Sequence, residues 1–205
     1  MYRFIEEQYI DKFLEKGILQ ISTFKHCKRL EDPIRKDRKE GQSVIVGVRG
    51  AIKMETQMMT GDNAFILCCS LASEYKNDHG VINKVALEIA NLERFVDECT
   101  KAITAKGYQV LNVQIGPCFY SEKEIHGELS EEDTDKLTSK DFTVEDIFAI
   151  PQRVAGPKMF FQKPLEKACE MEYRMVWIVY PDPKEETMLI QLENMSQYAR
   201  KNVSR

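Results

Sequence analysis

The segment 171–180, MEYRMVWIVY, alternates strictly, and this pattern restricts the fold of the chain more than any other. Successive side chains of a β-strand point to opposite faces. One face of this strand would carry only apolar and aromatic side chains, whereas the other would begin with Glu170, Glu172 and Arg174 and become apolar further along. The pattern predicts a central strand that is covered on both faces and opens into a cleft at its first end.

Two carboxylates and a guanidinium beside a core carry a high desolvation cost unless they are paired or used. Glu170, Glu172 and Arg174 are therefore candidates for a functional site. The alternative is that Arg174 forms a structural ion pair with one of the glutamates, and the sequence leaves both interpretations open.

Length and composition predict one domain over residues 1–205, since 205 residues with 43% hydrophobic content suffice for one core. The net charge of −4 argues against binding of nucleic acid or membranes through bulk charge. No apolar run reaches membrane-spanning length and the N-terminus does not resemble a signal peptide, so we expect no membrane association. The six cysteines form no CxxC pair, which predicts a reduced, cytoplasmic protein without disulfides or a metal site.

Hydrophobic periodicity predicts six or seven strands and two or three helices. The further strands are expected at 2–4, 18–22, 64–70, 84–89, 108–115 and 187–192, and the alternation of 43–48 makes it a candidate for one more. Helices are expected within 5–14, after the N-cap Asn91, and over 142–150, where the helix should stop before Pro151. The segment 121–141 is expected to be an acidic surface excursion, and the C-terminal tail to be basic and frayed. Because strands and helices do not alternate regularly, the prediction is an α+β fold with a mixed sheet.

The charged segment 29–41, RLEDPIRKDRKEG, is expected to follow a strand end directly, where ligands commonly bind in α/β folds. Arg35, Arg38 and Lys39 are candidates to bind phosphates, and Asp37 or Glu40 to accept from a ribose. We expect 35–40 to be mobile or ordered by a ligand. The alternative is a solvated loop, the usual structure of a run of charges.

The segment Ala64–Ser70, AFILCCS, is a continuous apolar run of strand length, which predicts a strand buried on both faces. Ser70 would end it at the mouth of the cleft. Cys68 and Cys69 are interpreted as packing residues, because no base nearby in the sequence would activate them. The chain contains no P-loop and no GxGxxG, HExxH or GxSxG motif, so the common nucleotide, zinc-protease and hydrolase signatures are absent.

Several short motifs occur together in an order that resembles a large group of bacterial and phage proteins whose chemistry is largely unassigned. The motifs are Tyr2-Arg3-Phe4, Gly17-x-Leu19-x-x-Ser22, Glu40-Gly41, Cys68-Cys69-Ser70, Leu92-x-x-Phe95, Phe160-x-x-Lys163 and Glu170-x-Glu172-Tyr173-Arg174. They span nearly the whole chain, although each motif alone has low specificity.

The same order is similar, more distantly, to the ADP-ribosyltransferase fold, which implies a split β-sheet with flanking helices. In that family a basic residue on the first strand binds NAD, a serine-bearing strand shapes the nicotinamide pocket, and a Glu-x-Glu pair supplies the catalytic glutamate. The resemblance assigns these roles to Arg3, to Ser70, and to Glu170 with Glu172. It implies cleavage of the nicotinamide–ribose bond through an oxocarbenium-like state, with Glu172 catalytic and Glu170 orienting the acceptor.

Two functions from different classes stay open. The first is an NAD-consuming transferase in phage–host conflict that modifies a protein or a nucleic acid, with Arg3, Ser70, Arg35, Arg38 and Arg174 as candidate NAD contacts. The second is a catalytically silent module, anti-defence or regulatory, whose cleft holds a nucleotide or a segment of a partner. The transferase hypothesis predicts that the strands carrying Arg3 and Glu172 are neighbours and line one cleft.

Overall fold

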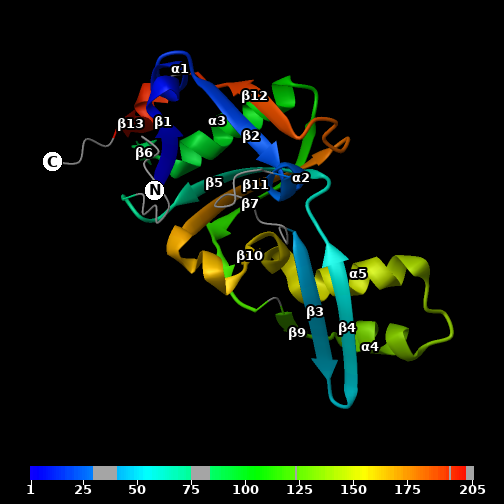
Figure 1. The fold of residues 1–205 in the computed structure, drawn as a ribbon. Helices are drawn as coiled ribbons and strands as arrows, with labels where there is room; N and C mark the ends of the chain where they lie inside the picture. The colour runs from blue at the N-terminus through cyan, green and yellow to red at the C-terminus, as the bar shows by residue number, and fades with distance from the viewer. Residues whose placement is uncertain (30–40, 75–83, 123, 194, 202–205) are drawn as a thin grey trace.

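The computed structural model describes residues 1–29, 41–74, 84–122, 124–193 and 195–201. Its main element is an eight-stranded sheet in which every described strand pair is antiparallel (Figure 1). The strands of the main sheet are β1 Tyr2–Glu6, β2 Ile18–Thr23, β5 Ala64–Ser70, β6 Lys84–Ile89, β7 Gln109–Pro117, β11 Glu172–Tyr180, β12 Thr187–Gln191 and β13 Ala199–Lys201.

Strand β5 lies at the branch point of the main sheet. β11 pairs with the whole length of β5, from Ser70 opposite Glu172 to Ala64 opposite Ile178. On the other edge, β2 pairs with Phe65 and Ile66, whereas β1 pairs with β5 only at Ser70. The strand order is therefore β12-β2-β5-β1-β6-β13, with β11 and then β7 on the opposite edge of β5.

Two hydrophobic clusters cover the two faces of β5 and β11, as the apolar runs of both strands predict. Met175 and Trp177 belong to the larger cluster, and Val176 belongs to the smaller one. The larger cluster includes buried residues of two helices, α1 Ile10–Leu14 and α3 Leu92–Ala105. The side chain of Asn91 caps α3 by accepting from the backbone N–H of Arg94, as predicted.

A smaller three-stranded sheet projects from the main sheet, and two helices pack against it (Figure 1). We call residues 42–59 and 124–155 the hairpin module. It contains β3 Gln42–Arg49, β4 Ile52–Met59, β9 Glu124–Glu128, α4 Glu131–Thr138 and α5 Val144–Ala155. β3 pairs antiparallel with β4 and parallel with β9, and Ile45, Met58 and Ile125 join the smaller cluster of the main sheet.

The remaining described elements are short. They are η1 Glu7–Tyr9, α2 Phe24–Arg29, β8 Phe119–Tyr120, η2 Gly156–Phe160, β10 Gln162–Lys163, η3 Leu165–Glu170 and η4 Met195–Gln197. β10 pairs parallel with β8, so parallel pairs occur in the two smaller sheets. The α+β class and the flanking helices are confirmed. No helix among the described residues is long and apolar enough to cross a lipid bilayer.

The structure differs from the sequence-based prediction in four places. The helix α2 separates β2 from the charged segment 29–41, so this segment does not directly follow a strand. The segment 121–141 contains β9 and α4, and its residues Ile125 and Leu129 are buried. α5 runs through Pro151 to Ala155, because burial of its C-terminal half compensates the backbone hydrogen bond that proline removes. The tail forms η4 and β13, since β13 pairs with β6.

Candidate functional site

The first residue of β11, Glu172, lies at the polar end of the main sheet, directly opposite Ser70 on β5. Met171 before it adopts the left-handed conformation, with φ 44° and ψ 46°. This residue turns the chain between η3 and β11, and Glu170 is the last residue of η3. The prediction that Glu170 belongs to the alternating strand is therefore wrong, and Glu170 and Glu172 are separated by a turn of the backbone.

Glu172 is held by contacts to both carboxylate oxygens. Lys163 Nζ lies 2.6 Å from Oε2, and Arg174 Nε donates to Oε1. The thiol of Cys118 lies 3.7 Å from Oε1, and the backbone N–H of Glu172 donates to the hydroxyl of Tyr120 at 2.7 Å. Glu172 is only 7% exposed, so this carboxylate is an interior charge whose partners are fixed.

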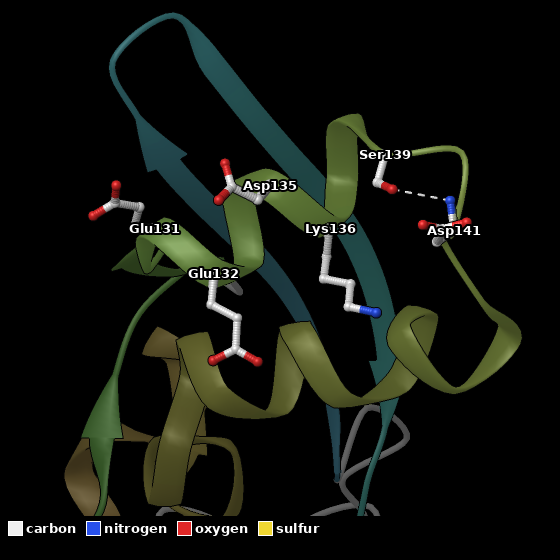
Figure 2. A pocket seen from close by; sticks show the side chains of 6 residues that line it. All are labelled: Glu131, Glu132, Asp135, Lys136, Ser139 and Asp141. Atoms are coloured by element: carbon white, nitrogen blue, oxygen red, sulfur yellow. Dashed lines mark hydrogen bonds between the residues drawn. The ribbon is translucent and has the colours of Figure 1, made fainter.

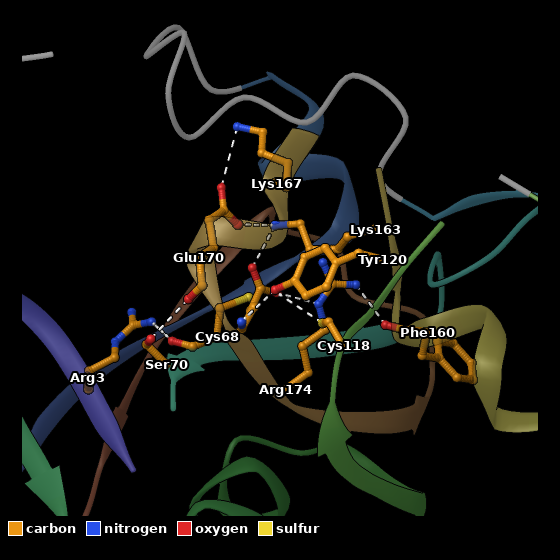
Figure 3. A network of polar contacts seen from close by, with 11 residues as sticks. Arg3, Cys68, Ser70, Cys118, Tyr120, Phe160, Lys163, Lys167, Glu170 and Arg174 are labelled. Carbon is orange, nitrogen blue, oxygen red and sulfur yellow. Dashed lines mark hydrogen bonds and ion pairs between the residues drawn. The ribbon is translucent and has the colours of Figure 1, made fainter. Parts of the chain in front are cut away.

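Lys163 joins the two glutamates, because its Nζ also lies 2.5 Å from Glu170 Oε2. It is placed by the parallel pairing of β10 with β8, in which Lys163 stands opposite Tyr120. Glu170 is partly exposed and also lies 3.4 Å from Lys167 Nζ, one turn earlier in η3. Figure 3 shows these side chains converging above the ends of β5 and β11.

Arg174 is 1% exposed and forms the inner part of the network. Its Nη1 donates to the backbone carbonyl of Phe160 at 2.7 Å, and its guanidinium carbon lies 5.7 Å from the ring centroid of Phe24. The ion pair of Arg174 with Glu172 is the structural alternative that the sequence left open. Arg174 is therefore an interior residue, and its role as an NAD contact stays a prediction.

The electrostatics of the network follow from burial and charge. Burial alone would raise the pKa of Glu172, but the charges of Arg174 and Lys163 outweigh burial and hold this pKa well below its usual range. Burial raises the pKa of Tyr120 to about 12, so its phenol is protonated at neutral pH. The site thus holds an ionised Glu172 between two cations and a neutral Tyr120.

Arg3 and Ser70 lie beside this network, on β1 and β5. The Ser70 hydroxyl donates to the backbone carbonyl of Glu170 at 3.0 Å and accepts from the N–H of Ala72 at 3.0 Å. Arg3 Nη1 donates to the backbone carbonyl of Cys68. The buried Nε of Arg3 has no hydrogen-bond partner among the residues that the structure describes. Ser70 is therefore satisfied, whereas the Nε of Arg3 is a buried donor without an acceptor among these described residues.

The expected adjacency of the strands that carry Arg3 and Glu172 is wrong, because β5 lies between β1 and β11. Ser70 on β5 is paired with Tyr2 on β1 and with Glu172 on β11, and Arg3 is the residue after Tyr2. Arg3 and Glu172 reach the same end of the sheet without being on neighbouring strands. The candidates Arg35 and Arg38, with the expected mobility of 35–40, lie outside the described residues.

Three residues of the network had no role in the sequence-based prediction. Cys118 lies between β7 and β8, Tyr120 is the last residue of β8, and Lys163 occurred only as part of a motif. The sequence does contain an indication that Lys163 is paired. Lys163 lies between the apolar residues 159–161 and Pro164, and a cation in apolar surroundings needs an acidic partner. Tyr120 carried no comparable signal.

The cysteines near the site are packing residues, as predicted. Cys69 is part of the larger hydrophobic cluster, and Cys68 packs against the smaller one. Burial raises the pKa of the Cys69 thiol to about 11 and raises that of Cys68 well above its usual value. Both thiols are therefore protonated at neutral pH and are poor nucleophiles.

The described part of the chain contains no group of three or more His, Cys, Asp or Glu side chains arranged to hold a metal ion. Comparisons with known protein families, curated proteins and solved structures find no match to this chain.

Proposed function

We propose that the polar end of the main sheet binds a phosphate-bearing nucleotide through Arg3 and that the protein acts there as a binding module that does not turn NAD over. The observation that carries this proposal is the difference between two residues of the site. Arg3 forms no ion pair among the described residues, whereas both oxygens of Glu172 are occupied by cations.

Arg3 has the properties of an anion ligand. Its guanidinium has five N–H donors, and one of them, at Nη1, is used by the carbonyl of Cys68. The Nε of Arg3 is buried and unpartnered within the described part of the chain, which costs free energy unless a ligand supplies an acceptor. A phosphate would reach Nε only after the Arg3 side chain shifts towards solvent, and Nε with a terminal nitrogen could then bind two of its oxygens, the geometry that an arginine fork matches.

Glu172 has the properties of a structural residue. A catalytic carboxylate must bind a ribose hydroxyl and oppose the positive charge of an oxocarbenium-like state. Glu172 would have to release Lys163 or Arg174 first, and separating a buried cation from this carboxylate is costly even though Lys163 would keep Glu170. The attraction that Glu172 offers to a developing positive charge is also reduced by two cations at contact distance.

ADP-ribosyl transfer is the second candidate, and one specific observation favours it. Ser70 is hydrogen-bonded to the backbone of Glu170 and stands opposite Glu172, so the serine and both glutamates meet at one end of the sheet. In this candidate NAD binding would draw Lys163 away from Glu172 towards the pyrophosphate. Glu170, which is partly exposed, would then be the carboxylate nearest to an acceptor.

The experiment is calorimetric titration of the purified protein with ADP, ATP and NAD, together with an assay of nicotinamide release. We expect binding of these nucleotides, about tenfold or more weaker in Arg3→Ala, because a charge-assisted bidentate contact is lost. Arg49→Ala, which removes a partly exposed arginine of the hairpin module, is the matched control and should bind like the parent.

The two candidates differ in the nicotinamide assay. A binding module releases no nicotinamide, with or without added protein or nucleic-acid acceptors. Release that Glu172→Gln abolishes while NAD still binds would establish the transferase and overturn the binding module. If none of the three nucleotides binds the parent protein, the nucleotide proposal is wrong.

A further inference from the structure

Four large apolar side chains are exposed around the N-terminal half of α5. Phe142 is 40% exposed, Val144 65%, Ile147 45% and Phe148 56%. Val144, Ile147 and Phe148 follow the i, i+3, i+4 spacing that places residues on one face of a helix. We call these four residues the α5 apolar face. Such a concentration within seven residues is larger than the scattered exposure usual on protein surfaces.

The exposure of this face follows from how α5 sits on the hairpin module. The C-terminal half of α5 is covered, since Ile150, Pro151 and Ala155 are buried. Contact with the small sheet is close there, because a Cβ on Gly127 would lie 2.6 Å from the carbonyl oxygen of Val154. The N-terminal half continues the same apolar stripe beyond this contact. The helix is therefore long enough to present a surface that its own module does not cover.

The surroundings of the α5 apolar face are strongly acidic. Seven acidic residues and two lysines lie between Glu131 and Phe148. Four of the acidic residues line a surface hollow of about 410 Å³ beside α4, together with Lys136 and Ser139 (Figure 2). They are Glu131, Glu132, Asp135 and Asp141. Asp141 directly precedes Phe142, so the acidic hollow and the apolar face meet at this point of the chain.

We propose that the α5 apolar face and its acidic surroundings bind a basic amphipathic helix of a partner protein. The apolar side of such a helix would pack on Ile147 and Phe148, and its lysines or arginines would reach Glu145 and the carboxylates of the hollow. Recognition of an amphipathic helix through spaced apolar anchors, with charges fixing its orientation, is a recurring binding mode. This inference does not depend on the proposed nucleotide site.

The sign of the charge selects this occupant over three others. A second copy of the chain would bring a second acidic surface against the first, and like charges that face each other oppose association. An anionic membrane surface would be repelled for the same reason. Nucleic acid requires a basic surface, which this face is not.

The test uses a synthetic peptide of about 18 residues, enough for five helical turns, with leucines on one face and lysines on the other. An otherwise identical peptide with glutamates in place of the lysines is the charge control. We expect the lysine peptide to bind the full chain and to protect the amides of 142–148 in hydrogen exchange, and its affinity to fall as salt is added. The glutamate peptide should not bind.

Phe148→Ser should weaken binding of the lysine peptide about tenfold or more, because it removes an aromatic anchor. Leu189→Ser is the matched control, since Leu189 on β12 is exposed to a similar extent but lies on the main sheet. Equal affinity for the two peptides, or equal loss in the two variants, would overturn the proposal. A concentration-dependent dimer that Phe148→Ser dissociates would also overturn it, because the face would then be covered by a second copy.

Discussion

Glu172 at the start of β11 and Glu145 in the first turn of α5 are both glutamates at the beginning of an element, but their surroundings differ. Glu172 is buried between Lys163 and Arg174 and stands opposite Ser70 of β5, a strand that is distant in sequence. Glu145 is exposed beside an apolar face. The comparison shows that the position of an acidic residue relative to the sheet, and not the local density of charge, separates structural carboxylates from those available to a partner.

The largest expected effect comes from removing the central charge of the buried network. Glu172→Gln removes the buried carboxylate between Lys163 and Arg174, while Lys163 keeps its contact with Glu170, so the free energy of unfolding should fall by about 3–5 kcal/mol. Denaturant unfolding followed by circular dichroism measures it. Glu170→Gln is the control and should cost about 1 kcal/mol or less, because Glu170 is partly exposed. Equal losses in both variants would remove the distinction between the two glutamates.

Acid should destabilise the protein through the buried network of Glu172, Lys163 and Arg174. The folded state lowers the pKa of Glu172 below its ordinary value of 4.5, so the stabilisation is complete above that value and is lost as the pH falls below it. The contribution of Glu172 should decline by up to about 1.4 kcal/mol per pH unit. Urea unfolding from about pH 7 to about pH 3 should show a smaller acid dependence in Glu172→Gln than in the parent. Identical slopes would show that Glu172 does not titrate differently on folding.

A smaller effect is expected from the ion pair of the hairpin module. Asp133 on α4 is buried, and its Oδ1 lies 2.9 Å from the Nε of Arg153 on α5, but Arg153 itself is half exposed. Water therefore screens the pair, and Asp133→Asn should destabilise the protein by about 1–2 kcal/mol. The unfolding midpoints of Asp133→Asn and Glu172→Gln are compared. This tests whether the exposure of Arg153 explains the smaller loss of stability in Asp133→Asn. A loss as large as that of Glu172→Gln would contradict this explanation.

The smallest effect is expected at the α5 apolar face. Phe148→Ser removes an exposed side chain that contributes little to the core, so the free energy of unfolding should change by about 0.5 kcal/mol or less. A change this small would show that any loss of peptide binding in Phe148→Ser does not come from unfolding. A destabilisation above about 2 kcal/mol would mean that Phe148 packs within the module and is not a free anchor.

Elements with a strong local pattern were predictable from the sequence. The bounds of β5 and β6 agree with the prediction, because a continuous apolar run and a clear alternation each specify a strand. α2 was missed, since its sequence FKHCKR has no apolar stripe and its one fully buried residue is Phe24. The helical continuation through Pro151 was missed because tertiary burial overrides a local breaker.

The place of Glu172 and Arg174 in the candidate site was predictable, but the other residues of the network and their connections were not. Alternation placed Glu172 and Arg174 at the polar end of a central strand, and both are there. It could not show that Lys163 reaches Glu172, because that contact depends on the pairing of β10 with β8. The turn at Met171 was also hidden, since a non-glycine residue in the left-handed conformation has no sequence signature.

The branch at β5 also determines the order in which the chain can fold during synthesis. Ser70 pairs with Tyr2 and with Glu172, so one edge of β5 has a partner early in translation and the other edge acquires β11 only about a hundred residues later. Until then the ribosome-bound chain presents an apolar strand with an unpaired edge, a template for association with other chains. Pairings of such long sequence separation also slow folding. We therefore expect expression of truncated chains that end before residue 172 to give aggregates, whereas chains that end after residue 180 should retain the central pairing.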